Sequence, residues 1–114
     1  MAMITIRNHP ERGRFEVLDG EAVIGQSAYL DHDGSQRIFY HTVIDEEYGG
    51  QGLAGRLAAQ ALDETVAAGL VIVPVCPYIR NYVEKHTRYA AHIRTPTPDI
   101  LEFLNTSLAG RARR

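Results

Sequence analysis

A glycine-rich stretch near the middle of the chain has the composition of an anion-binding turn. Four glycines fall within seven residues, between an apolar, β-branched run and a segment with helical spacing. Glycines let bare backbone amides approach a ligand, and the start of a helix directs unpaired N–H groups and the positive end of its dipole outward. Such a turn favours phosphate. We therefore expect the pyrophosphate of a cofactor to bind here, at Gly49, Gly50, Gln51, Gly52, Leu53, Ala54 and Gly55.

Three other interpretations of these glycines are available. Residues 50–55 match the dinucleotide-binding pattern G-x-G-x-x-G, but that fold needs several parallel β-α-β units and an acidic residue after the next strand, where Cys76 stands. A nucleotide-hydrolase loop requires Lys and Ser or Thr at the positions of Arg56 and Leu57. The remaining alternative is a tight turn whose glycines only allow close packing of a helix on a sheet.

The single cysteine is the second candidate for chemistry. Cys76 directly precedes Pro77, and proline is favoured at the first position of a helix, so Cys76 is expected at or near the N-cap. The helix dipole would favour the nucleophilic thiolate at that position. The alternative is a small buried hydrophobic residue at the end of a strand.

The elements that must position these residues can be predicted from hydrophobic periodicity. Strands are expected at residues 3–8, 14–18, 21–30 and 36–44, with Gly25 as a candidate bulge, so the first part of the chain should form an antiparallel meander. A helix over residues 52–68 and a buried strand over 70–75 then predict a right-handed crossover with the fourth and fifth strands parallel. Helices are expected at 77–89 and 99–108. The predicted fold class is α+β with a mixed sheet.

Length and composition favour one domain over residues 1–114, with a core at about 5–92 and a C-terminal extension at 93–114. The chain is 45% hydrophobic with a formal net charge of −2, so no broad nucleic-acid-binding surface is expected. No apolar run approaches the ~20 residues that span a bilayer, so no membrane association is expected. One cysteine fits a reducing cytoplasm, and the five histidines lack zinc-ligand spacing, so no metal is expected.

Two paired segments resemble a known family. Residues 41–54, followed by Val73-Pro74-Val75-Cys76-Pro77-Tyr78 and then Lys85-His86, are similar to the short YjdJ-type branch of the GNAT N-acetyltransferases. The resemblance covers about residues 5–92. It implies that acetyl-CoA is the cofactor and that its pyrophosphate binds through the motif Q/R-x-x-G-x-G/A. We map this motif onto Glu47 to Gly52, with Glu47 in the usual Gln/Arg position.

The resemblance also implies how the cofactor is placed. The fourth and fifth strands should splay apart, and the pantetheine arm should pair with the backbone near Val43 and Ile44. The helix after Cys76 should face the cofactor with some of its side chains, for which the candidates are Tyr78, Asn81, Tyr82 and Lys85. The implied acceptor is an unidentified amine, a small molecule or a protein, and the protein is expected to be a monomer or a weak homodimer.

Acetyl transfer to an amine needs a base or desolvation of the amine, a donor for the carbonyl oxygen and an acid for the leaving thiolate. Cys76 and His41 are the best candidate pair. In one hypothesis Cys76 takes the acetyl group first, with His41 as its base. In the other, the amine attacks directly with His41 as base and Cys76 only lines the cleft. A non-catalytic CoA-binding or protein-interaction module is the alternative function.

Overall fold

The structure of the protein is a computed structural model that describes residues 3–112, with side chains up to Gly110. Five strands form one sheet in the order β1-β2-β3-β4-β5. The strands are β1 Ile4–His9, β2 Arg14–Asp19, β3 Ala22–His32, β4 Gln36–Ile44 and β5 Val71–Pro74. The first four strands pair with one another in antiparallel fashion, and β5 is parallel to β4. The predicted mixed α+β fold is therefore confirmed.

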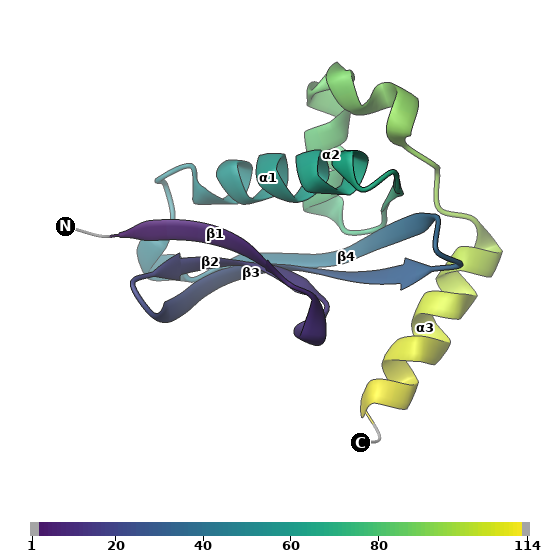
Figure 1. Cartoon of the computed structure of the whole chain (residues 1–114), viewed down its shortest axis with the longest axis horizontal. Helices are drawn as coiled ribbons and strands as arrows, with labels where there is room; N and C mark the ends of the chain where they lie inside the picture. The colour runs from purple at the N-terminus through teal and green to yellow at the C-terminus, as the bar shows by residue number, and fades with distance from the viewer. Residues whose placement is uncertain (1–2, 113–114) are drawn as a thin grey trace.

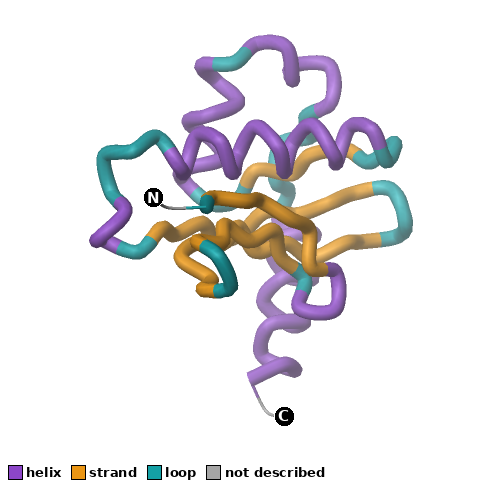
Figure 2. The backbone as a smooth tube through the Cα atoms, turned by 60° about the vertical axis from the view of Figure 1, so that its left-hand side comes forward, coloured by secondary structure: helices purple, strands orange, loops and turns teal. Residues whose placement is uncertain are grey.

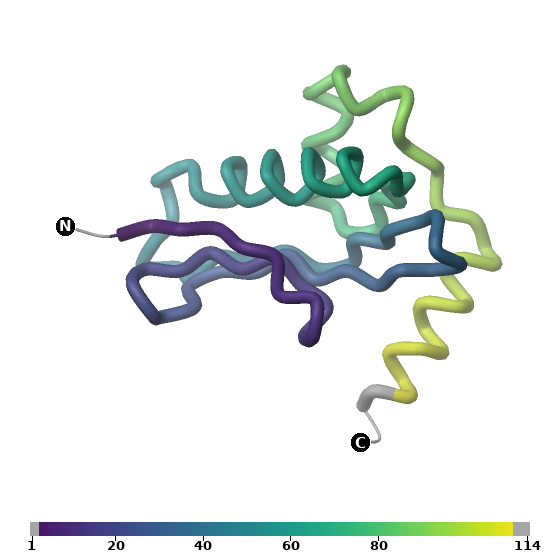
Figure 3. Tube along the Cα trace, viewed as in Figure 1, coloured from purple at the N-terminus to yellow at the C-terminus, as the bar shows by residue number. Residues whose placement is uncertain are grey.

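The helices lie on both faces of this sheet. Helix α1 (Leu53–Ala67) and helix α2 (Pro77–Lys85) lie on one face, which we call the helix face. Helix α3 (Pro98–Ala112) packs against the opposite face, which we call the far face (Figures 1 and 2). Short 3-10 helices cover Pro10–Arg12 (η1), Glu46–Tyr48 (η2) and Thr87–His92 (η3). The trace in Figure 3 shows the antiparallel strands first, then α1, β5, α2 and finally α3.

Each face of the sheet has its own apolar cluster. On the helix face, buried side chains of β2, β3 and β4 pack against α1 and α2, and this cluster includes Phe15, Phe39, Leu57, Ile79 and Cys76. On the far face, Ile38 and Val73 pack against Ile100 and Leu104 of α3. Adjacent residues of β4 therefore serve different clusters, because successive side chains of a strand point to opposite faces.

The helix expected at residues 99–108 runs from Pro98 to Ala112, and three other predictions also need correction. The helix expected at residues 77–89 ends at Lys85, because His86 leaves helical geometry and the chain continues as η3. Both the N–H group and Nδ1 of His86 bond to the carbonyl of Tyr82. The third strand extends to His32, which shortens the following turn. The bulge in this strand is at Ile24 rather than Gly25, since Val17 pairs with Gly25 and Leu18 with Val23.

Candidate functional site

The glycine turn presents free backbone amides at the start of α1. Gly50 and Gly52 adopt φ of +76° and +73°, a region that side-chain-bearing residues rarely adopt. Gly52 is the N-cap of α1, and the first amide of the helix to reach back is that of Arg56, which donates to the Gly52 carbonyl at 3.1 Å. The amides before it in this first turn have no carbonyl partner within the helix. This is the geometry of an anion-binding helix start.

A groove of about 440 Å³ lies beside this turn, between α1 and α2. Its lining brings together five residues that the sequence predicted and one neighbour: Gly55, Tyr78, Asn81, Tyr82, Lys85 and His86. A Cβ added at Gly55 would stand 3.8 Å from the Tyr78 hydroxyl, so the missing side chain keeps this end of the groove open. Burial, with a smaller contribution from Tyr82, raises the pKa of Tyr78, which therefore remains a hydroxyl donor at neutral pH.

Strands β4 and β5 part at the inner end of the site. Their pairing runs from Gln36 with Val71 to Phe39 with Pro74. The N–H groups of Val75 and Cys76 both donate to the Phe39 carbonyl at 3.0 Å, and there the chain turns away into α2. Strand β4 continues to residue 44, so its last five residues have no β5 partner within the described chain. The predicted splay of these strands is thus confirmed.

The backbone groups that face this gap follow from the pairing with β3. The N–H of Asp45 donates to the carbonyl of Ile24 in β3 at 2.8 Å, and Ile44 is opposite Gly25. In an antiparallel pair the residues alternate in bonding direction, so the polar backbone groups of Ile44 and Thr42 point into the gap. Those of Val43 point toward β3. The backbone groups of Thr42, rather than those of the predicted Val43, therefore point into the gap between β4 and β5.

A bulge in β4 decides which side chains face the helices. Ala28 pairs with His41 but Tyr29 pairs with Phe39, so Tyr40 is an extra residue. Phe39 and Thr42 consequently share the helix face, although their spacing in an unbroken strand would put them on opposite faces. His41 lies on the far face and is exposed, as is Val43 with 44% of its surface accessible.

Cys76 is buried and its polar neighbour is Thr42, not His41. Only 4% of Cys76 is accessible, and its sulfur lies 3.4 Å from Thr42 Oγ1. Thr42 Oγ1 in turn lies 3.0 Å from Ser27 Oγ. The structure does not bring Cys76 and His41 together as expected, because the bulge directs His41 to the far face. Cys76 is the N-cap of α2 as predicted, without a side-chain capping bond.

The sequence analysis missed Thr42 and Ser27. Both are small polar residues within apolar strands, and Ser27 is fully buried. Regular alternation from Phe39 would put Thr42 on the far face, and no glycine or proline marks the bulge at Tyr40. The signal in the sequence is a serine and a threonine within two predicted antiparallel strands, where they could lie opposite each other and form a hydrogen bond.

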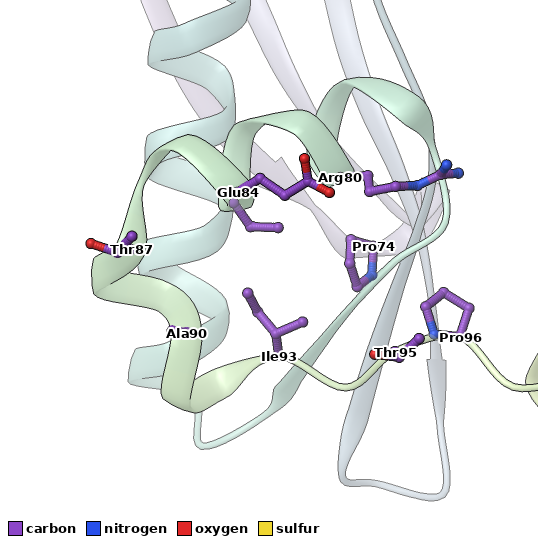
Figure 4. Close-up of a pocket in the computed structure, with 9 residues that line it drawn as sticks. Pro74, Arg80, Glu84, Thr87, Ala90, Ile93, Thr95 and Pro96 are labelled. Atoms are coloured by element: carbon purple, nitrogen blue, oxygen red, sulfur yellow. The ribbon is translucent and has the colours of Figure 1, made fainter.

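A larger groove, of about 780 Å³, lies on the other flank of α2 (Figure 4). Its lining combines apolar side chains with Arg80 and Glu84: Pro74, Arg80, Val83, Glu84, Thr87, Ala90, Ile93, Thr95 and Pro96. The guanidinium of Arg80 donates to the Val75 carbonyl at 3.1 Å, which secures the N-terminal part of α2 to the end of β5. None of the residues predicted for the site lines this groove.

Residues 3–112 contain neither a candidate metal site nor a membrane-spanning helix. No group of three or more His, Cys, Asp or Glu side chains in this range could hold a metal ion. In the same range, no helix is both long and apolar enough to cross a membrane.

The chain is similar to a protein family and to a solved structure. Residues 14–93 match the family model described as GCN5-related N-acetyl-transferase. A GCN5-like protein from Staphylococcus aureus, solved by NMR, has a similar fold, with a TM-score of 0.66, 21% identity and coverage of 86% of this chain and 95% of that one. Ard1 from Thermoplasma volcanium aligns with a TM-score of 0.47 and 11% identity. The alignment covers 53% of this chain and 41% of Ard1. No curated protein sequence matches the chain.

Proposed function

The chain belongs to the GCN5-related N-acetyltransferase family, and from this premise we propose that it transfers the acetyl group of acetyl-CoA to an amine. We also propose that it represents the short YjdJ-type branch. The observation that carries the proposal is the parting of β4 and β5 beside a glycine turn and an open groove. A cofactor with a phosphate-rich end and a thin thioester arm matches this combination of a glycine turn, an open groove and a gap between strands.

The glycine turn fits a pyrophosphate. Gly50 and Gly52 hold the backbone in a conformation that aims amides outward. Apart from each glycine and its chain neighbours, no atom of the described residues lies within 4 Å of where their Cβ atoms would be. Two registers satisfy the last two defined positions of the family motif, Glu47 to Gly52 and Gly49 to Ala54, and neither has Gln or Arg at the first position. We favour the second, because it places the last three motif positions at the N-cap and first turn of α1, where amides are free. Glycine then occupies the Gln/Arg position.

The remaining parts of the cofactor would lie on either side of the turn. Lys85, which lines the groove, supplies a positive charge that the motif lacks. Tyr78, Asn81 and Tyr82 supply two rings and an amide along the same wall. In the gap, the backbone groups of Thr42 and Ile44 are the partners for an amide-containing arm, as an added strand would use them.

The two faces of the sheet suggest how donor and acceptor are kept apart. The cofactor groove lies on the helix face, whereas His41 is exposed on the far face beside the same unpaired part of β4. An amine that approaches from the far face would meet His41 as a general base and the thioester through the gap. This arrangement supports direct transfer with His41 as base. Covalent transfer through Cys76 remains the second route, with a base other than His41.

Calorimetry and an acceptor screen test the proposal. We expect acetyl-CoA to bind, and CoA thiol to be released when a suitable amine from a panel of small amines and lysine peptides is added. No binding at millimolar acetyl-CoA would contradict both the enzyme and its alternative, the non-catalytic CoA-binding module. Binding without thiol release for any amine would favour the module.

Two variants then separate the routes on an identified acceptor. Under direct transfer, His41→Ala should lower kcat, and Cys76→Ala should retain turnover. Under the covalent route, acetyl-CoA should leave an acetyl group on Cys76 that mass spectrometry detects, and Cys76→Ala should abolish turnover.

A further inference from the structure

A pair of hydroxyl groups leads from the interior of the sheet to the sulfur of Cys76. Ser27 is fully buried, and its Oγ lies 3.0 Å from Thr42 Oγ1 across the β3–β4 pair. Thr42 Oγ1 is also 3.4 Å from Cys76 Sγ. Thr42 thus lies between Ser27 and Cys76, at the strand segment whose backbone faces the gap.

The direction of the hydrogens in this chain follows from the cost of leaving a buried donor unpaired. Among the described residues, Ser27 Oγ has no hydrogen-bond partner other than Thr42. If Thr42 donated to Ser27, the buried hydroxyl hydrogen of Ser27 would lack an acceptor, which is unfavourable. If Ser27 donates to Thr42 and Thr42 donates to the sulfur, only the weak S–H donor of Cys76 is left. The second direction therefore costs less.

We propose that Thr42 is a positioning residue for Cys76: its hydroxyl, oriented by Ser27, donates to Sγ and holds the sulfur at the opening between β4 and β5. The proposal rests on the covalent route of the proposed function, which puts a thioester in that opening beside Cys76. Because the Thr42 hydroxyl donates to Sγ, the S–H bond of Cys76 points away from Thr42, and its proton is available for transfer. In acetyl transfer to Cys76, a bond forms between Sγ and the acetyl carbon, the bond from that carbon to the CoA sulfur breaks, and the CoA sulfur takes the proton that Cys76 gives up.

The competing explanation is that two hydroxyls and a thiol merely satisfy one another in the core. The two explanations differ in what the hydroxyl of Thr42 does to the reactivity of the sulfur. They do not differ in what it does to stability, because both require a paired hydroxyl. The test must therefore measure the thiol itself, independently of folding.

The chain has a single cysteine, so alkylation by iodoacetamide measures Cys76 alone. We would compare the second-order alkylation rate at one neutral pH for wild type, Thr42→Val, Thr42→Ser and Ser27→Ala, with thermal unfolding as a fold check. Thr65→Val is the matched control, since Thr65 is also fully buried and donates to the Ala61 carbonyl at 2.7 Å within α1.

We expect Thr42→Val to lower the alkylation rate about fivefold to tenfold, because it removes a hydroxyl-to-sulfur hydrogen bond of ordinary strength. Thr42→Ser keeps that hydroxyl and should retain most of the wild-type rate. Ser27→Ala should lower the rate less than Thr42→Val does. Thr65→Val should react like wild type. A wild-type rate in Thr42→Val, equal losses in the valine and serine variants, or an unreactive wild-type thiol would overturn the proposal. Calorimetry with acetyl-CoA reports separately on the proposed function, so the two can fail independently.

Discussion

At the scale of single residues, Gly52 serves both the fold and the proposed cofactor site. It ends the turn with φ of +73° and is the N-cap of α1. Replacement by alanine should lower the free energy of unfolding by about 1 kcal/mol, because a Cβ disfavours this conformation. Calorimetry should also show weaker acetyl-CoA binding, roughly tenfold or about 1.4 kcal/mol, because the backbone can no longer approach the pyrophosphate closely.

Gly34→Ala is the matched control for this prediction. Gly34 has φ of +72° and lies in the turn between β3 and β4. Its added Cβ would also meet no atom within 4 Å in the part of the chain that the structure describes, its own chain neighbours aside. We expect the same loss of stability and unchanged binding. Equal binding losses in the two variants would contradict a specific role of Gly52.

Lys85 is predicted to contribute positive charge to the groove. Lys85→Ala should weaken acetyl-CoA binding by about twofold to fivefold at low salt. The effect should be smaller at high salt, because the Lys85 ammonium and the cofactor charge that it attracts are both exposed to solvent. Titrations at two salt concentrations measure this, with Arg12→Ala in the exposed η1 turn as control. A salt-independent loss would indicate that Lys85 acts through packing.

Glu16 is a buried carboxylate whose ion pairs stabilise the sheet. Its side chain is 1% accessible and accepts bonds from Arg14 Nε at 2.7 Å and from Arg7 Nε at 3.0 Å, with His9 at 3.2 Å. Burial alone would raise the pKa of this carboxyl, but the bonds from these three residues outweigh it and lower the pKa below 4.5. The unfolded state then binds more protons than the folded state in acid.

The stabilisation from Glu16 is accordingly present above pH 4.5 and is lost as the pH falls through the lower folded pKa. Glu16→Gln should lower the free energy of unfolding at pH 7 by about 1–3 kcal/mol, because the carboxylate partner of Arg14 is removed. Urea unfolding should show that this difference shrinks at pH 3. A difference independent of pH would contradict the account, and Glu11→Gln, at a carboxylate 79% accessible, should have little effect.

At the scale of elements, β4 shows what the sequence can and cannot predict. Its bounds at Gln36 and Ile44 were predicted correctly, because an apolar run lies between two turn sequences. The faces of its second half were not predictable. One extra residue at Tyr40 exchanges the faces of His41 and Thr42, and neither composition nor periodicity reveals it. The groove residues on α2 were named because the resemblance implies that the helix after Cys76 faces the cofactor, and the structure places them along one groove.

Helix α3 lies beyond residues 14–93, the range of the family match, and packs on the far face. Leu104, 4% accessible, contacts the Ile38 and Val73 cluster, whereas Leu101 is 40% accessible. Leu104→Ala should lower the free energy of unfolding by about 2–4 kcal/mol, because it leaves a cavity between α3 and the sheet. Leu101→Ala, on the same helix, should cost less than about 1 kcal/mol in urea unfolding.

Calorimetry should give the same acetyl-CoA affinity for both leucine variants, because α3 is on the face opposite the groove. A loss of affinity in Leu104→Ala without loss of fold would mean that α3 contributes to the cofactor site.

At the scale of the whole molecule, the sheet separates two surfaces and α2 separates two grooves. The groove between α1 and α2 contains the predicted cofactor residues, and the larger groove behind α2 contains none of them. The gap between β4 and β5 begins where the chain turns into α2, whose Tyr78 lines the first groove. His41 lies on the face that α1 and α2 leave uncovered. The central claim is therefore spatial: acetyl-CoA binds along the α1–α2 groove and enters the sheet at the end of β4.

Amide chemical-shift mapping during a titration with acetyl-CoA tests this claim most directly. We expect the largest shifts at Thr42, Ile44, Gly50, Gly52 and Lys85, and small shifts at Arg80, Glu84 and Thr95 in the larger groove. The largest shifts at those three residues, or no shifts at saturating acetyl-CoA, would contradict it.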